Sequence, residues 1–192
     1  MRHIRKAFII NICIVIFEII SLIWMMSGIS KGMLSASSWH MLRYFTIDSN
    51  ILMAIVSLIF VIYEIILDKG SIKEIPTFIY NLKFLGVAAI TLTFVVTLFF
   101  LAPLYGFYAM YNNNNLFFHL IVPVLSIVSF IFIEKYDVKY KYSFIGVIPM
   151  MLYSIFYTTN ILTHLVDGKP TWEYDFYGFL FGDVRNAFIT LP

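Results

Sequence analysis

The sequence predicts an all-α protein, a polytopic transmembrane helical bundle that forms a single integral membrane domain over residues 1–192. Of the 192 residues, 61% are hydrophobic and only 12% are charged, whereas a soluble domain carries about 25% charged residues. The apolar residues form long runs, close to the roughly 20 residues that a helix needs to cross a bilayer. Backbone polar groups in lipid must be satisfied within each segment, which favours helices over β-structure.

The apolar runs predict five full spans plus an incomplete sixth. The expected helices cover residues 7–29, 45–67, 78–101, 116–133 and 142–162, and the third is expected to end before Pro103. A last apolar segment covers residues 184–192. At about 1.5 Å per residue it is too short to cross a bilayer.

The distribution of lysine and arginine predicts the orientation. Nine of the 13 basic residues precede the first span or lie in or beside two loops, the one between spans two and three and the one between spans four and five. They are Arg2, Arg5, Lys6, Lys69, Lys73, Lys83, Lys135, Lys139 and Lys141. The positive-inside rule then places the N-terminus in the cytoplasm of a multi-pass cell-membrane protein. Helices two and four would both begin at the outer face.

The fourth run, residues 115–134, carries an ionisable residue inside a membrane segment. His119 lies about one turn after its start, and Pro123 follows four residues later. Proline has no N–H, so it frees a carbonyl one turn back, which in a regular helix is that of His119. An ionisable group at this depth indicates a functional site by default. The structural alternative is a histidine that is hydrogen-bonded to a neighbouring helix at the headgroup level.

The start of the second run offers a partner for this histidine. Thr46, Ser49 and Asn50 are spaced i, i+3 and i+4, so they share one helix face. A threonine hydroxyl acts as a nucleophile only when a base removes its proton, and a neutral histidine is a usual base. The structural alternative is a threonine bonded to the carbonyl four residues earlier.

Other chemistry is weakly indicated. Glu18 lies in the middle of the first run and is expected to face the bundle interior with a hydrogen-bond partner, or to mark a proton or ion path. The histidines and acidic residues do not follow a compact metal motif, and no cofactor fingerprint is present, so neither metal nor cofactor is expected. The single cysteine, Cys13, excludes an intramolecular disulfide.

Two short motifs resemble a known family. The stretches YFTIDSNIL (residues 44–52) and NLFFHLIVPVL (residues 115–125), with the aromatic loop that begins at Trp172, resemble the androgen-induced-gene family of multi-spanning membrane proteins and its bacterial branch. Animal members of that family are described as hydrolases of fatty acid esters of hydroxy fatty acids. The resemblance implies a threonine nucleophile at Thr46, a histidine partner at His119 and the accompanying proline at Pro123.

These observations lead to one functional hypothesis and two alternatives. The hypothesis is an intramembrane hydrolase of lipid (fatty acid) esters near the outer face, with Asn50 or Asn115 as oxyanion donors and Ser49 as a supporting residue. The expected partners are the bilayer and a lipid or fatty-acyl ester, with no nucleic acid. The first alternative is a non-catalytic lipid-binding or scaffold protein. The second is a small transporter that uses Glu18.

Overall fold

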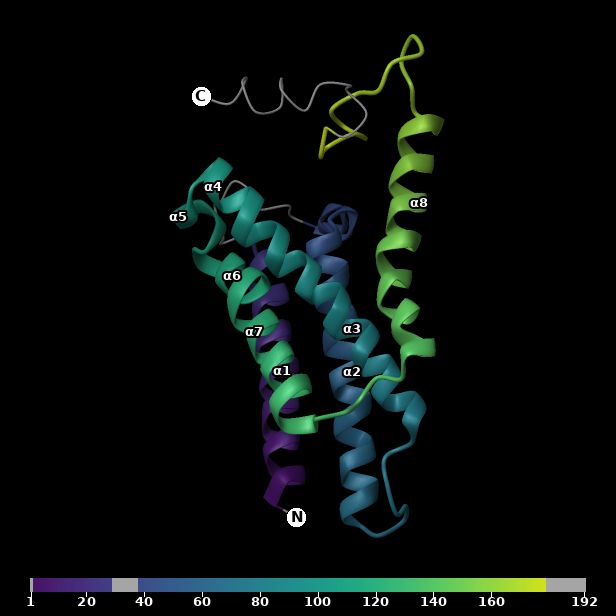
Figure 1. The fold of residues 1–192 in the computed structure, drawn as a ribbon. Helices are drawn as coiled ribbons and strands as arrows, with labels where there is room; N and C mark the ends of the chain where they lie inside the picture. The colour runs from purple at the N-terminus through teal and green to yellow at the C-terminus, as the bar shows by residue number, and fades with distance from the viewer. Residues whose placement is uncertain (1, 29–37, 179–192) are drawn as a thin grey trace. The chain divides into compact units, whose positions relative to one another are not determined.

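The structure is a computed structural model that describes residues 2–28 and 38–178. It is 79% helical, and these ranges contain no strand. Among the described residues, five helices are long and apolar enough to cross a membrane: Lys6–Met26, Phe45–Asp68, Thr77–Tyr105, Asn113–Glu134 and Tyr140–Thr163 (Figure 1). The predicted all-α helical bundle with five full spans is therefore confirmed, and the chain is a multi-pass membrane protein. The partial sixth segment, residues 184–192, lies outside the described residues.

The chain divides into two compact units, Met1–Ile148 and Pro149–Pro192. The first unit contains the first four spans and the beginning of the fifth. The second contains most of the fifth span and the aromatic loop that follows it. The single domain predicted from the sequence includes both units.

Helix α1 (Arg2–Met26) has a polar interior face and an apolar outer face. Its buried positions follow a spacing of four and three residues, which places them on one stripe: Ala7, Asn11, Ile14, Glu18, Ser21 and Met25. Its exposed residues include Ile9, Ile16, Ile19, Ile20 and Ile23. This distribution is typical of a helix whose outer face contacts lipid, because hydrocarbon solvates isoleucine and excludes polar groups. The helix ends three residues earlier than predicted, where Gly28 takes a left-handed φ of +67°.

Helices α2 (Phe45–Asp68) and α3 (Thr77–Val96) pack closely against each other. Gly86 of α3 makes this approach possible. A Cβ atom at this position would lie 2.7 Å from Val56 Cγ2 and 3.2 Å from Met53 Sδ on α2. Small residues at helix contacts are the usual solution in membranes, where close backbone packing replaces the hydrophobic driving force.

The prediction that the third span ends before Pro103 is wrong. After α3 the span continues through a π-helical turn, η2 (Thr97–Leu101), and a short helix, α4 (Ala102–Tyr105). The wide turn places Pro103 in the first turn of α4, where a missing N–H is tolerated. The span ends instead at Gly106, whose φ of +93° is left-handed.

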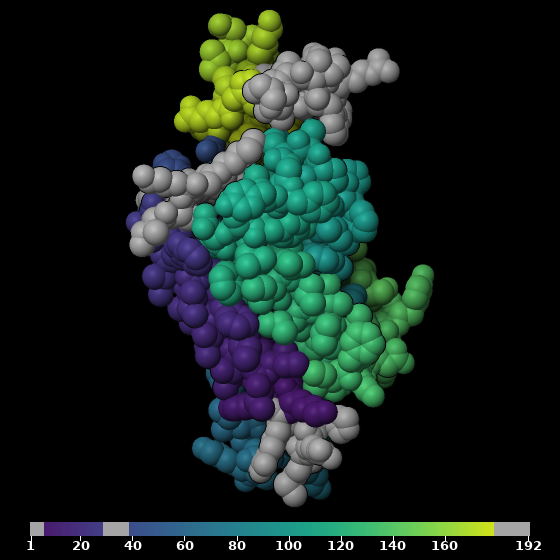
Figure 2. All heavy atoms as spheres, turned by 90° about the vertical axis from the view of Figure 1, so that its left-hand side faces the viewer, coloured from purple at the N-terminus to yellow at the C-terminus, as the bar shows by residue number. Residues whose placement is uncertain are grey.

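The fourth span is built from four consecutive pieces. They are α6 (Asn113–Leu116), the π-helical segment η3 (Phe117–Ile121), α7 (Val122–Val128) and the π-helical segment η4 (Ser129–Glu134). A short helix, α5 (Phe107–Met110), precedes them. Figure 2 shows α1 in purple alongside the teal and green fourth span.

The fifth span begins as a 3-10 segment, η5 (Tyr140–Val147), which packs against α3. It continues as α8 (Ile148–Thr163), so the regular helix begins six residues later than predicted. Within the second unit the aromatic loop folds onto α8. Tyr157 donates from its hydroxyl to Asp175 and accepts from the Tyr177 N–H at 3.0 Å.

Candidate functional site

The first turn of α2 is organised around the backbone carbonyl of Thr46. This oxygen accepts hydrogen bonds from the Ser49 hydroxyl at 3.0 Å and from the Asn50 amide at 2.7 Å. The three residues therefore share one face, as their spacing predicts. Thr46 itself is half-buried. Its hydroxyl forms no hydrogen bond within the described part of the chain, so the alternative in which it bonds to the carbonyl four residues earlier does not hold.

Ser49 connects this turn to α3. Its hydroxyl lies 2.8 Å from Thr93 Oγ1, and both side chains are buried. The hydroxyl of Ser49 has one hydrogen, and the Thr46 carbonyl can only accept. Thr93 therefore donates to Ser49, and Ser49 donates to Thr46. Ser49 supports the backbone of the turn and is not available as a second nucleophile in this arrangement.

Pro123 produces a bulge in the helix that carries His119. The Val122 N–H donates to the Phe117 carbonyl, five residues earlier, instead of to Phe118. The next possible donor to the Phe118 carbonyl is residue 123, and proline has no N–H. The Asn50 amide occupies this acceptor from α2, at 3.1 Å. The sequence predicted a freed carbonyl at His119. The π-turn shifts the carbonyl that needs an outside donor by one residue, to Phe118.

His119 is held in one orientation by the loop that precedes its helix. The residue is only 2% exposed, and its Nδ1 lies 2.8 Å from the Met110 carbonyl oxygen. A carbonyl only accepts, so Nδ1 carries the hydrogen, and in the neutral ring Nε2 then has the free lone pair. Nε2 is the atom that could accept a proton from a nucleophile. Met110 was not singled out in the sequence, because a backbone acceptor leaves no side-chain signal.

The two asparagines proposed as oxyanion donors differ in how firmly their amide hydrogens are already engaged. The Asn50 amide already donates to the carbonyls of Thr46 and Phe118, so both of its hydrogens are engaged. Asn115 is buried and makes one long bond, 3.4 Å, to the Ala109 carbonyl. Of the two, Asn115 can present a hydrogen to a ligand at smaller cost. Asn50 acts as a tether between α2 and the bulge.

The structure places Thr46 and His119 on neighbouring segments. Asn50 joins the Thr46 carbonyl to the residue directly before His119, which confirms that the second and fourth spans are adjacent. The described residues include no hydrogen bond between the Thr46 hydroxyl and the His119 ring. Direct pairing of these two side chains stays a prediction.

Tyr111 adds a further polar group next to Met110. Its hydroxyl is buried and has no hydrogen-bond partner among the described residues. Burial raises the pKa of the Tyr111 phenol, so the phenol stays protonated and keeps its donor. The sequence analysis does not single out this hydroxyl.

Two other polar residues differ from their predicted roles. Glu18 is fully buried as expected, but the expected hydrogen-bond partner is wrong, since neither carboxyl oxygen bonds to a described residue. The sequence predicts that Lys83 lies at the positively charged flank of a cytoplasmic loop. It lies fully buried inside the bundle, because α3 begins at Thr77 and carries Lys83 almost two turns inward. Within the described ranges, no group of three His, Cys, Asp or Glu side chains is placed to hold a metal ion.

Comparison of the chain with models of known families, with curated proteins and with solved structures gives no match. The features that bear on function are the first turn of α2, the His119 bulge and the resemblance of the two short motifs.

Proposed function

We propose that this protein is an intramembrane hydrolase of lipid (fatty acid) esters, with Thr46 as the nucleophile and His119 as the base. The observation that carries the proposal is the hydrogen bond from His119 Nδ1 to the Met110 carbonyl at 2.8 Å. This bond selects the tautomer whose Nε2 accepts a proton, which is the form that a general base needs. The motif resemblance supports the same two residues.

The proposed reaction begins when the Thr46 oxygen attacks the ester carbonyl carbon and His119 Nε2 takes the hydroxyl proton. The carbonyl oxygen becomes an oxyanion in the tetrahedral intermediate. As the bond to the alcohol oxygen breaks, the imidazolium returns the proton to that oxygen, and an acyl-threonine remains. Water then attacks this acyl group with His119 as base, which releases the fatty acid and restores the Thr46 hydroxyl.

Donors for the oxyanion are available from two directions. Thr46 lies in the first turn of α2, where backbone N–H groups have no carbonyl partner within the helix. The N–H groups of Ile47 and Asp48 donate to the Tyr44 carbonyl, so that of Thr46 is the donor nearest to the nucleophile. The second hydrogen of the Asn115 amide is the other candidate.

The proposed orientation places this chemistry near the outer face of the cell membrane. Without the buried Lys83, the remaining lysines and arginines keep the same bias, with the N-terminus in the cytoplasm. Thr46 at the beginning of α2 then lies at the depth of an ester bond in a lipid. The acyl chains would remain in the hydrocarbon and enter laterally between helices.

The test is covalent labelling of the purified protein in lipid nanodiscs with a fluorophosphonate probe. Labelling of the parent is expected, and it should be abolished by Thr46→Ala and retained in part by Thr46→Ser. Thr91→Ala is the matched control, because Thr91 is another half-buried membrane threonine, bonded to the Val87 carbonyl at 2.6 Å. Equal labelling of Thr46→Ala and the parent would show that the nucleophile is wrong. Absence of labelling in a folded parent would favour the non-catalytic alternative.

The His119→Asn variant distinguishes a catalytic role of His119 from a purely structural one. The asparagine amide can reach the position of Nδ1 and keep the bond to the Met110 carbonyl, but it has no base. Thermal stability close to the parent with loss of labelling is the expected result. Retained labelling would exclude His119 as the base.

A further inference from the structure

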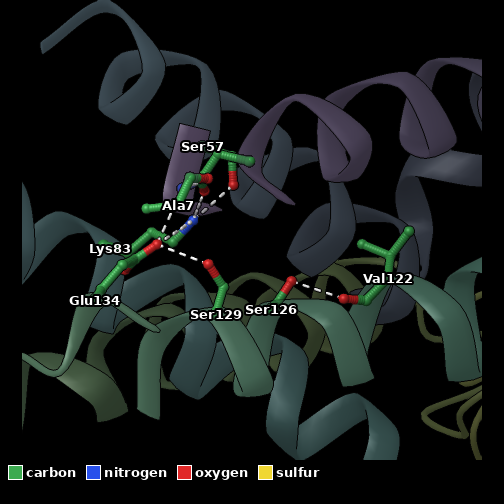
Figure 3. A network of polar contacts seen from close by, with 8 residues as sticks. Ala7, Ser57, Lys83, Val122, Ser126, Ser129 and Glu134 are labelled. Atoms are coloured by element: carbon green, nitrogen blue, oxygen red, sulfur yellow. Dashed lines mark hydrogen bonds and ion pairs between the residues drawn. The ribbon is translucent and has the colours of Figure 1, made fainter. Parts of the chain in front are cut away.

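A second cluster of buried polar side chains lies at the other end of α2, and its centre is the Lys83 amine. Lys83 is fully buried and donates to the Asn11 side-chain oxygen and to Ser57 Oγ at 2.9 Å. Its Nζ lies 3.6 Å from Glu134 Oε1 and 5.5 Å from the centre of the Phe60 ring. Figure 3 shows Lys83 and Glu134 pointing toward each other, with Ser57 and Ser129 beside them. Four spans therefore contribute to this cluster.

Only one of the two carboxyl oxygens of Glu134 has hydrogen-bond partners among the residues that the structure describes. Its Oε1 accepts from the Asn11 amide at 3.0 Å and from Ser129 Oγ at 2.9 Å, in addition to the ion pair with Lys83. Its Oε2 is buried and has no partner in the described part of the chain, although the side chain is fully inaccessible. A buried carboxylate oxygen without a partner is costly, so Oε2 is an open acceptor of this cluster.

Glu64 gives the cluster a second carboxyl group. The residue is 2% exposed, and its Oε2 is also buried without a partner among the described residues. It interacts electrostatically with both Lys83 and Glu134. If all three groups were ionised, two carboxylates would face one ammonium, and the apolar interior would carry an uncompensated negative charge. A buried charge without a partner is strongly unfavourable.

We propose that Lys83, Glu134 and Glu64 form a proton-binding site, in which the two carboxyl groups share one exchangeable proton beside the Lys83 ammonium. A proton from the aqueous phase binds to a carboxylate oxygen and makes the cluster neutral. Its return to water or a buffer base restores the net negative charge. Tyr80, near the start of α3, interacts electrostatically with both Glu64 and Glu134. Tyr80 in turn interacts with Glu74 in the loop before α3 and with Tyr136 after η4.

The position of Glu64 gives this proton a short path to water. Glu64 lies one turn before Asp68, where α2 ends, and Asp68 is exposed and borders an exposed loop. Thr46 lies 18 residues earlier in the same helix. At about 1.5 Å per residue this separates Thr46 from Glu64 by about 27 Å, and Ser57, the partner of Lys83 on α2, lies about 17 Å from Thr46 along the helix. The proton site is therefore distinct from the proposed hydrolase site.

Infrared spectroscopy of the protein in lipid nanodiscs at neutral pH tests the proposal. A protonated carboxyl group and a carboxylate absorb at different wavenumbers, so their bands can be told apart. The parent should show a protonated-carboxyl band from the cluster. Glu64→Gln and Glu134→Gln should each lose it, since either variant leaves one carboxylate beside one ammonium. Lys83→Met should strengthen it, because two carboxyls then lack a counter-charge. Glu74→Gln, which changes an exposed carboxyl nearby, should leave it unchanged.

The same measurement controls for the signal of other buried carboxyl groups and for binding of a metal cation in place of a proton. All variants are made in a Glu18→Gln background, which removes the other buried carboxyl of α1, and folding is checked by thermal unfolding. Glu64→Gln keeps the Lys83–Glu134 pair, so it is the decisive variant if others fail to fold. A band that persists in folded Glu64→Gln overturns the proposal. Loss of the parent band on addition of sodium ions also overturns it and assigns the site to a metal cation.

Discussion

The side-chain amide of Asn50 donates to the backbone carbonyl of Phe118 over 3.1 Å. This bond exists because Pro123 removes the N–H that would otherwise reach that carbonyl, and the π-turn before it engages the Val122 N–H elsewhere. The asparagine on the second span thus supplies the hydrogen bond that the proline removes from the fourth span. This bond stabilises the helical bulge that carries His119.

The pairing of Asn50 with the bulge predicts a specific coupling. Asn50→Ala should lower the free energy of unfolding by about 1 kcal/mol or more, because it leaves the Phe118 carbonyl without a donor. Pro123→Ala supplies an N–H that can reach this carbonyl. Asn50→Ala should therefore cost less in the Pro123→Ala background, which a double-mutant cycle of unfolding measures.

The control for that cycle is Asn160→Ala, in which a half-buried asparagine of the other unit is removed. Its cost should be the same with and without Pro123→Ala. Additive effects of Asn50→Ala and Pro123→Ala would contradict the proposed compensation.

Thr46 and His119 should behave as one catalytic unit. Each alanine substitution should abolish ester turnover, and the double variant should be little worse than either one, since residues that act together are non-additive. The measurement is hydrolysis of a long-chain fatty acid ester by the purified protein. Chelators should leave turnover unchanged, and inhibition by chelation would replace the threonine mechanism with a metal-dependent one.

The orientation is testable with cysteines on either side of the third span. Lys73 lies in the exposed loop before α3, and Tyr108, which is 84% exposed, lies in the short helix α5 after the third span. In a Cys13→Ala background, Tyr108→Cys should react with a membrane-impermeant thiol reagent on intact cells, and Lys73→Cys only after lysis. Labelling of Lys73→Cys alone on intact cells would reverse the orientation and move the proposed hydrolase site to the cytoplasmic face.

Gly86 should tolerate no large side chain. Gly86→Leu forces α2 and α3 apart at Val56 and Met53, and it should lower the free energy of unfolding by about 1–3 kcal/mol. Thermal unfolding in detergent measures this. Val95→Leu, at an exposed position of the same helix, is the control and should leave the free energy of unfolding nearly unchanged. An unchanged stability of Gly86→Leu would show that the close packing is not required.

The sequence by itself determined the number and approximate extent of the spans, because a run of apolar residues long enough to cross hydrocarbon has few other stable states. It also placed Thr46, Ser49 and Asn50 on one face, since helical spacing alone decides this. It identified Glu18 as an interior residue from the cost of exposing a carboxyl to lipid.

Only the tertiary structure decided which polar groups meet. The roles of Met110 and of the Phe118 carbonyl depend on backbone atoms that every residue possesses, so no side-chain pattern reveals them. The third span continues past Pro103 because the π-helical turn η2 places this proline in the first turn of α4, where its missing N–H is tolerated. Lys83 appeared to be a loop residue, and its true environment comes from Asn11, Ser57 and Glu134 on three other spans. Contacts between residues far apart in the chain depend on how the helices pack, and the order of residues along one helix does not contain that information.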